Sequence, residues 1–385
     1  MTEKQLIEAT KRLIAIPSTG DNYEALKQAL DFIAAMIWAQ CPDVTIERFE
    51  SNSRPSLLAY RGEQRPDRFR ILFNGHLDVV PGKPEQYKAV VKDGKLFGRG
   101  VYDMKAACVA LTDVFCQFVN EVPYSLGLQI VTDEESAGSD GTQHQIKQGV
   151  RADFVVCGEC GRHPNVYEIA NEAKGIAAID VAFPGVAAHS AYPWKGENAA
   201  LRASNFIQAL HKHYPAPEEE THETTVSVTA LAASSGAHSK LPDRATMMIV
   251  ARYTAADPNF RSLEQVLTFL QRLDPDIEIV NVLDFSSPLY TNPSNSLLLR
   301  LKATAEKVEA AEFSFVRRHG TGDGRFYGDV GGEACEFGVA GDHAHADGEY
   351  ITLEAFHNYI VTMRQFMEQT ITSEPKPTHI KAHVA

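Results

Sequence analysis

The first half of the chain alternates between helical and strand-like spacing of its apolar residues, and this alternation restricts the folds open to it. Helical spacing runs through residues 6–14 and 24–38, and short apolar runs typical of strands follow. The expected strands are residues 44–49, 56–60, 69–73, 126–131 and 154–157, with further helices at 104–118 and from residue 142. Strands that alternate with helices indicate an α/β fold with a mixed, largely parallel sheet flanked by helices.

The pattern changes after Lys174, which indicates a second domain inserted into the first. A strand, a helix, two strands, a helix and a final strand follow in the order βαββαβ, the split ferredoxin-like motif. These elements are expected at residues 175–183, 198–211, 224–232, 245–253, 262–273 and 277–283. We therefore expect an inserted α+β domain over residues 175–284.

The α/β pattern resumes after this insertion, so the first domain is expected to be discontinuous. The elements that resume it are a helix at 295–309, strands near Phe313 and Phe337, and a helix at 353–370. A chain of 385 residues is too long for one ordinary core. We expect residues 1–174 and 285–385 to form the larger domain.

The charge balance excludes some classes of partner. The formal net charge is -13, and no Lys/Arg-rich stripe offsets it, so we expect no nucleic-acid partner. The polar segment Met1–Gln5 does not resemble a secretory signal, and the longest apolar runs are too short to cross a bilayer. We therefore expect a cytoplasmic protein with no membrane partner.

The cysteines are too dispersed to predict a disulfide framework in a chain of this length. They are Cys41, Cys108, Cys116, Cys157, Cys160 and Cys335. Cys157 and Cys160 have the spacing of a zinc ribbon or a redox pair, but no second pair accompanies them. We interpret Cys157 as the end of a buried strand.

Residue types that bind divalent metals recur at the ends of the predicted strands. They are His76, Asp103, the pair Glu134 and Glu135, Glu159, and His345 near the C-terminus. Imidazole and carboxylate groups are the ligands of catalytic zinc sites, and ligands collect at the carboxyl ends of strands in such folds. The sequence thus predicts a catalytic centre with two divalent metal ions, with Zn expected and Co or Mn chemically suitable.

Several of these residues allow more than one role when they are taken alone. Asp78 lies two residues after His76 and can orient its second ring nitrogen, whereas Asp103 is either a bridge between metals or a helix cap. Adjacent carboxylates in an extended segment point in different directions, so one can bind metal while the other moves a proton. We therefore expect Glu134 to transfer the proton and Glu135 to bind metal.

Spacing alone does not decide which of the later histidines bind metal or act in catalysis. Either His343 or His345, or both from one strand face, could supply a ligand. His189, in the inserted domain, would by itself more often be a surface histidine than a catalytic one.

Taken together, these motifs resemble the family of acetylornithine deacetylase, succinyl-diaminopimelate desuccinylase, aminoacylase and the glutamate-releasing carboxypeptidases. The segments that carry the resemblance are Gly75-His76-Leu77-Asp78, Gly98-Arg99-Gly100, Asp103-Met104-Lys105, Asp133-Glu134-Glu135, Gly158-Glu159, Ala188-His189-Ser190 and His345 with Glu349. The resemblance covers nearly the whole chain and implies a zinc-exopeptidase-like fold.

The resemblance also implies roles for the residues of the centre. His76 and Glu159 would bind one metal, Glu135 and His345 the other, and Asp103 would bridge them. It implies that Glu134 is the general acid/base and Asp78 the partner of His76. A Glu four residues after His345 favours His345 over His343.

For the inserted domain, the resemblance implies a lid and, in many relatives, a homodimer surface. His189 would then donate to the oxyanion of the reaction. Arg252, Arg325 and Thr321 match substrate-binding positions, the last two in the loop 320–326. Cys160, the turn at residues 239–242 and Gly322 differ from the family pattern, so the identity of the acyl group or amino acid in the substrate stays open.

The function that follows is hydrolysis of an amide bond in a small carboxylate-bearing substrate, such as an N-acyl amino acid. A di- or tripeptidase or carboxypeptidase of the same family is the alternative, and a non-catalytic metal-binding homologue belongs to a different class. The partner that we expect is a small-molecule substrate, with a homodimer through the lid as a further expectation.

Overall fold

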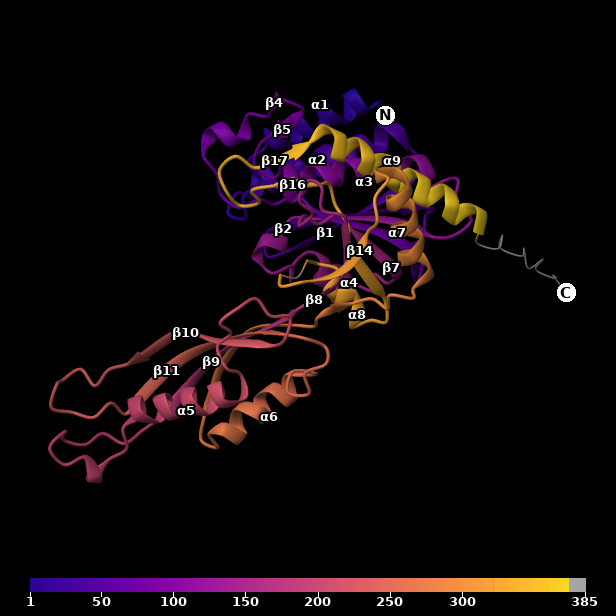
Figure 1. Cartoon of the computed structure of the whole chain (residues 1–385). Helices are drawn as coiled ribbons and strands as arrows, with labels where there is room; N and C mark the ends of the chain where they lie inside the picture. Colours follow the sequence, from indigo (N-terminus) through magenta and orange to yellow (C-terminus); the bar gives the residue numbers. More distant parts are fainter. Residues whose placement is uncertain (321, 374–385) are drawn as a thin grey trace. The chain divides into compact units, whose positions relative to one another are not determined.

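A computed structural model describes residues 1–320 and 322–373 (Figure 1). The chain divides into two compact units. The first comprises Met1–Asn171, Tyr290–Val316 and the chain from Gly322 onward, and the second comprises Glu172–Leu289 with a short segment that begins at Arg317. The insertion expected at 175–284 lies within the second unit, and the segment at Arg317 was not expected.

The first unit is built on a nine-stranded sheet in the order β1-β2-β6-β3-β7-β15-β8-β13, with β14 paired to β8. Its centre consists of β6, β3, β7 and β15, which are parallel to one another, whereas the pairs β1–β2, β2–β6 and β15–β8 are antiparallel. This confirms the predicted mixed, largely parallel sheet. The strands are β1 (Val44–Ser51), β2 (Arg54–Arg61), β3 (Phe69–His76), β6 (Leu126–Val131), β7 (Ala152–Cys157), β8 (Glu168–Ala173), β13 (Leu289–Tyr290), β14 (Ser314–Arg318) and β15 (Glu333–Glu336).

Helices pack on this sheet and bury its central strands. β6 is buried along its whole length, which explains why its sequence reads as a continuous apolar run. α3 packs against β3 and β6, with α2 and α9 beside it, while α4 and α8 contact each other (Figure 1). The helices are α1 (Glu3–Ile14), α2 (Tyr23–Gln40), α3 (Ala106–Phe118), α4 (Thr142–Lys147), α7 (Ser296–Glu309), α8 (Arg325–Gly328) and α9 (Leu353–Ser373).

A second, small sheet of the first unit was not predicted. It has the order β16-β17-β5-β4, and its strands are β4 (Val90–Lys92), β5 (Lys95–Phe97), β16 (Gly341–Asp342) and β17 (Tyr350–Thr352). These strands have only two or three residues each, too few to show a periodicity. The sheet matters because the loop between β16 and β17 carries His345.

The second unit has its own four-stranded antiparallel sheet, in the order β10-β11-β9-β12, and its own apolar core. Its element order is the βαββαβ order expected from the sequence. The elements are β9 (Gly175–Pro184), α5 (Ala199–His213), β10 (Thr225–Ala233), β11 (Arg244–Tyr253), α6 (Leu263–Leu273) and β12 (Glu278–Ser286). None of the described helices combines the length and the hydropathy needed to traverse a bilayer.

Candidate metal centre

The centre lies where three parallel strands of the first unit end. In the register of the sheet, His76 at the end of β3 is opposite Val131 at the end of β6, and Asn74 is opposite Cys157 at the end of β7. The segments that follow β6 and β7 therefore begin next to His76. They carry the carboxylates that the sequence singled out.

Two groups of potential ligands share one carboxylate. Asp103 belongs both to a group with His76 and Glu159 and to a group with Glu135 and His345, and in each group the donor atoms lie within 4.8 Å of one another. The structure thus brings together all five residues that the sequence proposed as ligands. Glu134 belongs to neither group.

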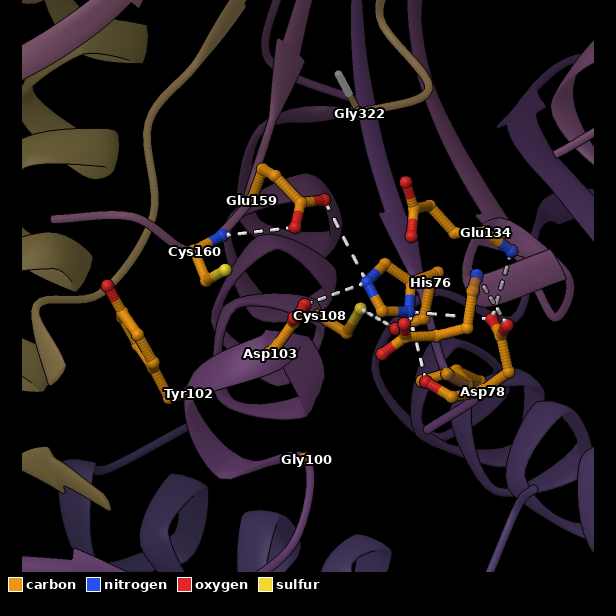
Figure 2. Close-up of polar contacts among 12 residues, drawn as sticks. His76, Asp78, Gly100, Tyr102, Asp103, Cys108, Glu134, Glu159, Cys160 and Gly322 are labelled. Carbon is orange, nitrogen blue, oxygen red and sulfur yellow. Dashed lines mark hydrogen bonds and ion pairs between the residues drawn. The ribbon is translucent and has the colours of Figure 1, made fainter. Parts of the chain in front are cut away.

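The geometry of Asp103 suits a bridge between two cations. Its Oδ1 lies 3.0 Å from Nε2 of His76, and its Oδ2 lies 3.0 Å from Nε2 of His345. Glu159 Oε2 is 3.8 Å from the same nitrogen of His76 (Figure 2). Glu135 Oε1 is 3.0 Å from Nε2 of His345. The two oxygens of one carboxylate therefore face two different histidines.

The electrostatics of the cluster favour bound cations. Burial, and then repulsion by Asp103, raise the pKa of Glu159 well above its usual value. The carboxylates of Asp103 and Glu135, each 3.0 Å from its Nε2, raise the pKa of His345 to about 10. Glu135 Oε1 is buried and, despite the nearby His345, has no well-oriented hydrogen bond among the described residues. A buried carboxylate needs a counter-charge, which a divalent cation supplies in place of protons.

His76 is held in the tautomer that a metal ligand needs. Its Nδ1 lies 3.0 Å from the backbone oxygen of Asp78 and 3.4 Å from the Asp78 carboxylate. A proton on Nδ1 can be donated to that oxygen, which leaves the lone pair of Nε2 facing Asp103 and Glu159. The Asp78 carboxylate itself accepts the backbone N–H groups of Glu134, at 3.3 Å, and Glu135, at 2.9 Å. Asp78 thus holds the turn of the two glutamates as well as His76.

The loop that carries Asp103 is anchored by Glu349, a role that sequence reasoning did not assign. The Glu349 carboxylate accepts the backbone N–H groups of Gly100 at 2.9 Å, Tyr102 at 2.9 Å and Asp103 at 3.2 Å, and pairs with Arg99 at 2.8 Å. This anchor lies four residues after His345, so one segment supplies both a potential ligand and the support of another. The peptide bond between Asp103 and Met104 is cis.

Glu134 lies beside the two groups with its carboxylate half-buried (Figure 2). Burial raises the pKa of Glu134 well above its usual value, and the nearby carboxylates of Asp323, Asp103 and Asp78 act in the same direction, while His76 opposes them. A carboxylate next to the potential ligands with a raised pKa is suited to accept and return a proton near neutral pH.

The proposed substrate-binding residues are distributed over both units. Arg325, in the first unit, is buried and donates to the backbone oxygens of Gly322 at 3.0 Å and Ala137 at 2.7 Å. Thr321 lies outside the described residues. Arg252, in the second unit, sits on β11 opposite Thr225 of β10 and Ile176 of β9.

His189 is an exposed residue of the second unit. Its Nδ1 accepts the backbone N–H of Ala191 at 3.0 Å, so in the neutral ring the proton sits on Nε2. The six cysteines of the chain are free thiols, Cys157 and Cys160 included.

One further carboxylate next to the centre was missed. Glu336, at the end of β15, is 6% exposed and accepts the backbone N–H of Gly322 at 2.9 Å. The signal in the sequence is the same as for Glu159, an acidic residue that follows a short apolar run. The apolar run before Glu336 is too short to distinguish a buried carboxylate from an exposed one.

Comparisons with known proteins identify the family of the chain. The model of peptidase family M20/M25/M40 matches residues 72–369. Succinyl-diaminopimelate desuccinylase of Thiobacillus denitrificans is 26% identical over 363 residues, which cover 89% of each chain. An M20 family metallo-carboxypeptidase, Sso-CP2 of Sulfolobus solfataricus, has the same fold, with a TM-score of 0.74, 17% identity, and 94% of this chain and 98% of that chain covered.

The aminopeptidase PepT of Bacillus cereus shares this fold too, with a TM-score of 0.73 and 18% identity over 96% of this chain and 99% of that chain. The family match spans well over half of the chain, and it confirms the resemblance inferred from the motifs. The chain therefore belongs to peptidase family M20/M25/M40 and is a metal-dependent hydrolase.

Proposed function

We propose that this protein hydrolyses the amide bond of a small carboxylate-bearing substrate, an N-acyl amino acid, with two zinc ions as its cofactor. The observation that carries the proposal is the position of Asp103, whose two oxygens each lie 3.0 Å from a different histidine of the two ligand groups. His76 and Glu159 would hold one ion, Glu135 and His345 the other, and Asp103 would bridge them. Cobalt or manganese would suit the same donors chemically.

When bound, two such ions acidify a water molecule and polarise the scissile carbonyl group. In this proposal Glu134 takes the proton of the attacking water and then delivers it to the departing amine. Its raised pKa supports both steps, because a stronger base accepts the proton and a carboxylic acid can still return it. Asp78 keeps Glu134 and Glu135 in place through their backbone N–H groups.

We assign the oxyanion contact to His189. Because Ala191 donates to Nδ1, the neutral ring presents an N–H donor at Nε2. In other hydrolases, one such preorganised donor raises the rate by a factor of about 10²–10³. Arg252 is our candidate for the substrate carboxylate, since the planar guanidinium binds carboxylates with two parallel hydrogen bonds. Arg325 would contribute through the loop that it holds, and Thr321 belongs to the same proposed region.

We also propose that the second unit acts as a lid and pairs with a second copy of the chain. Its sheet exposes Leu231 by 52% and Val280 by 55%, and both line one hollow together with Met248. Exposed apolar side chains gathered on one face are typical of interaction surfaces. Sedimentation of the wild type and of Leu231→Glu tests this: a wild type that is monomeric at micromolar concentration would refute it.

A substrate panel assayed with metal-reconstituted protein tests the main proposal. We expect kcat/KM for acetylornithine or succinyl-diaminopimelate to exceed that for di- and tripeptides. Failure on every acyl amino acid with turnover of peptides would establish the peptidase alternative, which the peptidases of the same fold support.

Glu134→Gln separates catalysis from metal binding. We expect kcat to fall by about 10²–10⁴, the usual contribution of a general acid/base, while metal content stays near two ions per chain. Asp140→Asn, in the same loop but outside both ligand groups, is the matched control. Unchanged turnover in Glu134→Gln would rule out its assigned role, and a wild type that binds no divalent ion would overturn the whole proposal.

A further inference from the structure

Glu336 is a buried carboxylate that the proposed reaction does not use. It ends β15, and the parallel register places it opposite Cys157, two residues before Glu159. The next residue, Phe337, donates its backbone N–H to Cys157 at 2.9 Å, so the two chain segments stay side by side beyond the strands. A further carboxylate beside the acidic ligand groups is unfavourable unless its contacts compensate.

The contact of Glu336 leads directly to Glu159. Its Oε1 accepts the backbone N–H of Gly322 at 2.9 Å. A Cβ atom placed on Gly322 would stand 3.0 Å from Glu336 Oε1 and 3.4 Å from Glu159 Oε2. The backbone of Gly322 therefore lies against both carboxylates. The oxygen of Glu159 that it touches is the one that faces His76.

The loop that starts at Gly322 is fixed at its other end to the turn of the two glutamates. Arg325 joins the Gly322 oxygen to the oxygen of Ala137, at 3.0 and 2.7 Å. Asp323 accepts the hydroxyl of Thr142 at 2.6 Å. Ala137 directly follows the turn Glu134–Ser136. The loop thus lies against Glu159 at one end, and at the other it is hydrogen-bonded to Ala137, next to the turn that carries Glu134 and Glu135.

We propose that Glu336 is a positioning residue of the metal centre: by holding the N–H of Gly322 it keeps the 322–325 loop pressed against Glu159, and so sets the Glu159 carboxylate against His76 and Asp103. The inference rests on the proposed function in that it needs ions in the two groups. Its effect is selective, because Glu336 supports the group of His76 and Glu159 and touches neither Glu135 nor His345 in any contact described above.

The test is the affinity of chelator-treated protein for zinc, measured by competition with a chromophoric chelator, with no substrate present. In Glu336→Ala we expect one of two ions to bind about 10–100-fold more weakly, the usual effect of removing a partner of a ligand, and the other ion to bind as in wild type. Glu336→Gln keeps an oxygen that can accept the Gly322 N–H, so its affinity for zinc should fall less.

Glu333→Ala is the matched control, because Glu333 lies on the same strand and accepts hydrogen bonds from Asn292 and Asn295 instead. Gly322→Ala is an independent variant. The methyl group that it adds would meet the carboxylates of Glu336 and Glu159. We expect it to weaken the same ion, even where Glu336→Ala does not fold.

The outcomes are separable. Wild-type affinity for both ions in Glu336→Ala and Gly322→Ala overturns the inference, as does equal weakening of both ions in either variant. A wild type that binds two ions but cleaves no amide refutes the proposed function and leaves the affinity comparison intact.

Discussion

Replacing Glu349 by Ala removes the anchor of the Asp103 loop and should destabilise the first unit strongly. Glu349 is 2% exposed and pairs with Arg99, which is 3% exposed. Breaking a buried ion pair by removing one partner costs about 3–5 kcal/mol, because the remaining charge stays buried and unpaired. The variant also leaves the backbone N–H groups of Gly100, Tyr102 and Asp103 without their acceptor.

Each of these N–H groups would add about 1 kcal/mol or more if no water replaced the carboxylate. Water can enter the space that the side chain vacates, so the sum of the ion-pair and N–H costs is an upper limit. We expect the free energy of unfolding to fall by about 4 kcal/mol or more. Glu349→Gln keeps an oxygen acceptor, so its free energy of unfolding should fall clearly less. The affinity for metal should fall in both variants, because Asp103 loses its backbone support.

The assay is urea unfolding of chelator-treated protein. The chain has two tryptophans, Trp38 in the first unit and Trp194 in the second. In a Trp194→Phe background the fluorescence of Trp38 reports on the first unit alone. Arg99→Met and the double variant complete a cycle that isolates the ion pair. A loss below about 1 kcal/mol in Glu349→Ala, far under the usual range for such a pair, would refute the reasoning.

Three further predictions follow from single contacts. Chelation should lower the midpoint of thermal unfolding, and zinc should restore it, because a ligand at 100 times its Kd adds about 2.7 kcal/mol; an unchanged midpoint would argue against bound ions. Gly100→Ala should cost about 1–3 kcal/mol, since φ is 76° and the new Cβ would stand 2.4 Å from Val79; unfolding in urea measures this loss. The hydrogen bond from Arg202 holds the pKa of Asp274 below 3.8, so this stabilisation is complete above that pH and fades as pH falls through the lowered pKa; acid titration of Asp274→Asn should lack that dependence.

The chain sequence determined the fold class and the identity of the candidate ligands. The central strands are buried on both faces, so their apolar runs are continuous and can be recognised locally. His76 and Glu159 stand at or just after the ends of such runs, where parallel strands bring side chains to one edge of the sheet. This information is contained in short stretches of sequence, which is why it could be inferred without coordinates.

Tertiary structure decided how the ligands are held. Glu349 and Asp103 are separated by 246 residues along the chain, and Glu336 and Gly322, 14 residues apart, meet only because a strand end and a loop pack together. No local periodicity records such pairings, since a buried carboxylate and a surface carboxylate are the same letter in a sequence. What distinguishes them is the loss of solvent around the charge, and only the packed structure determines which N–H groups replace that solvent.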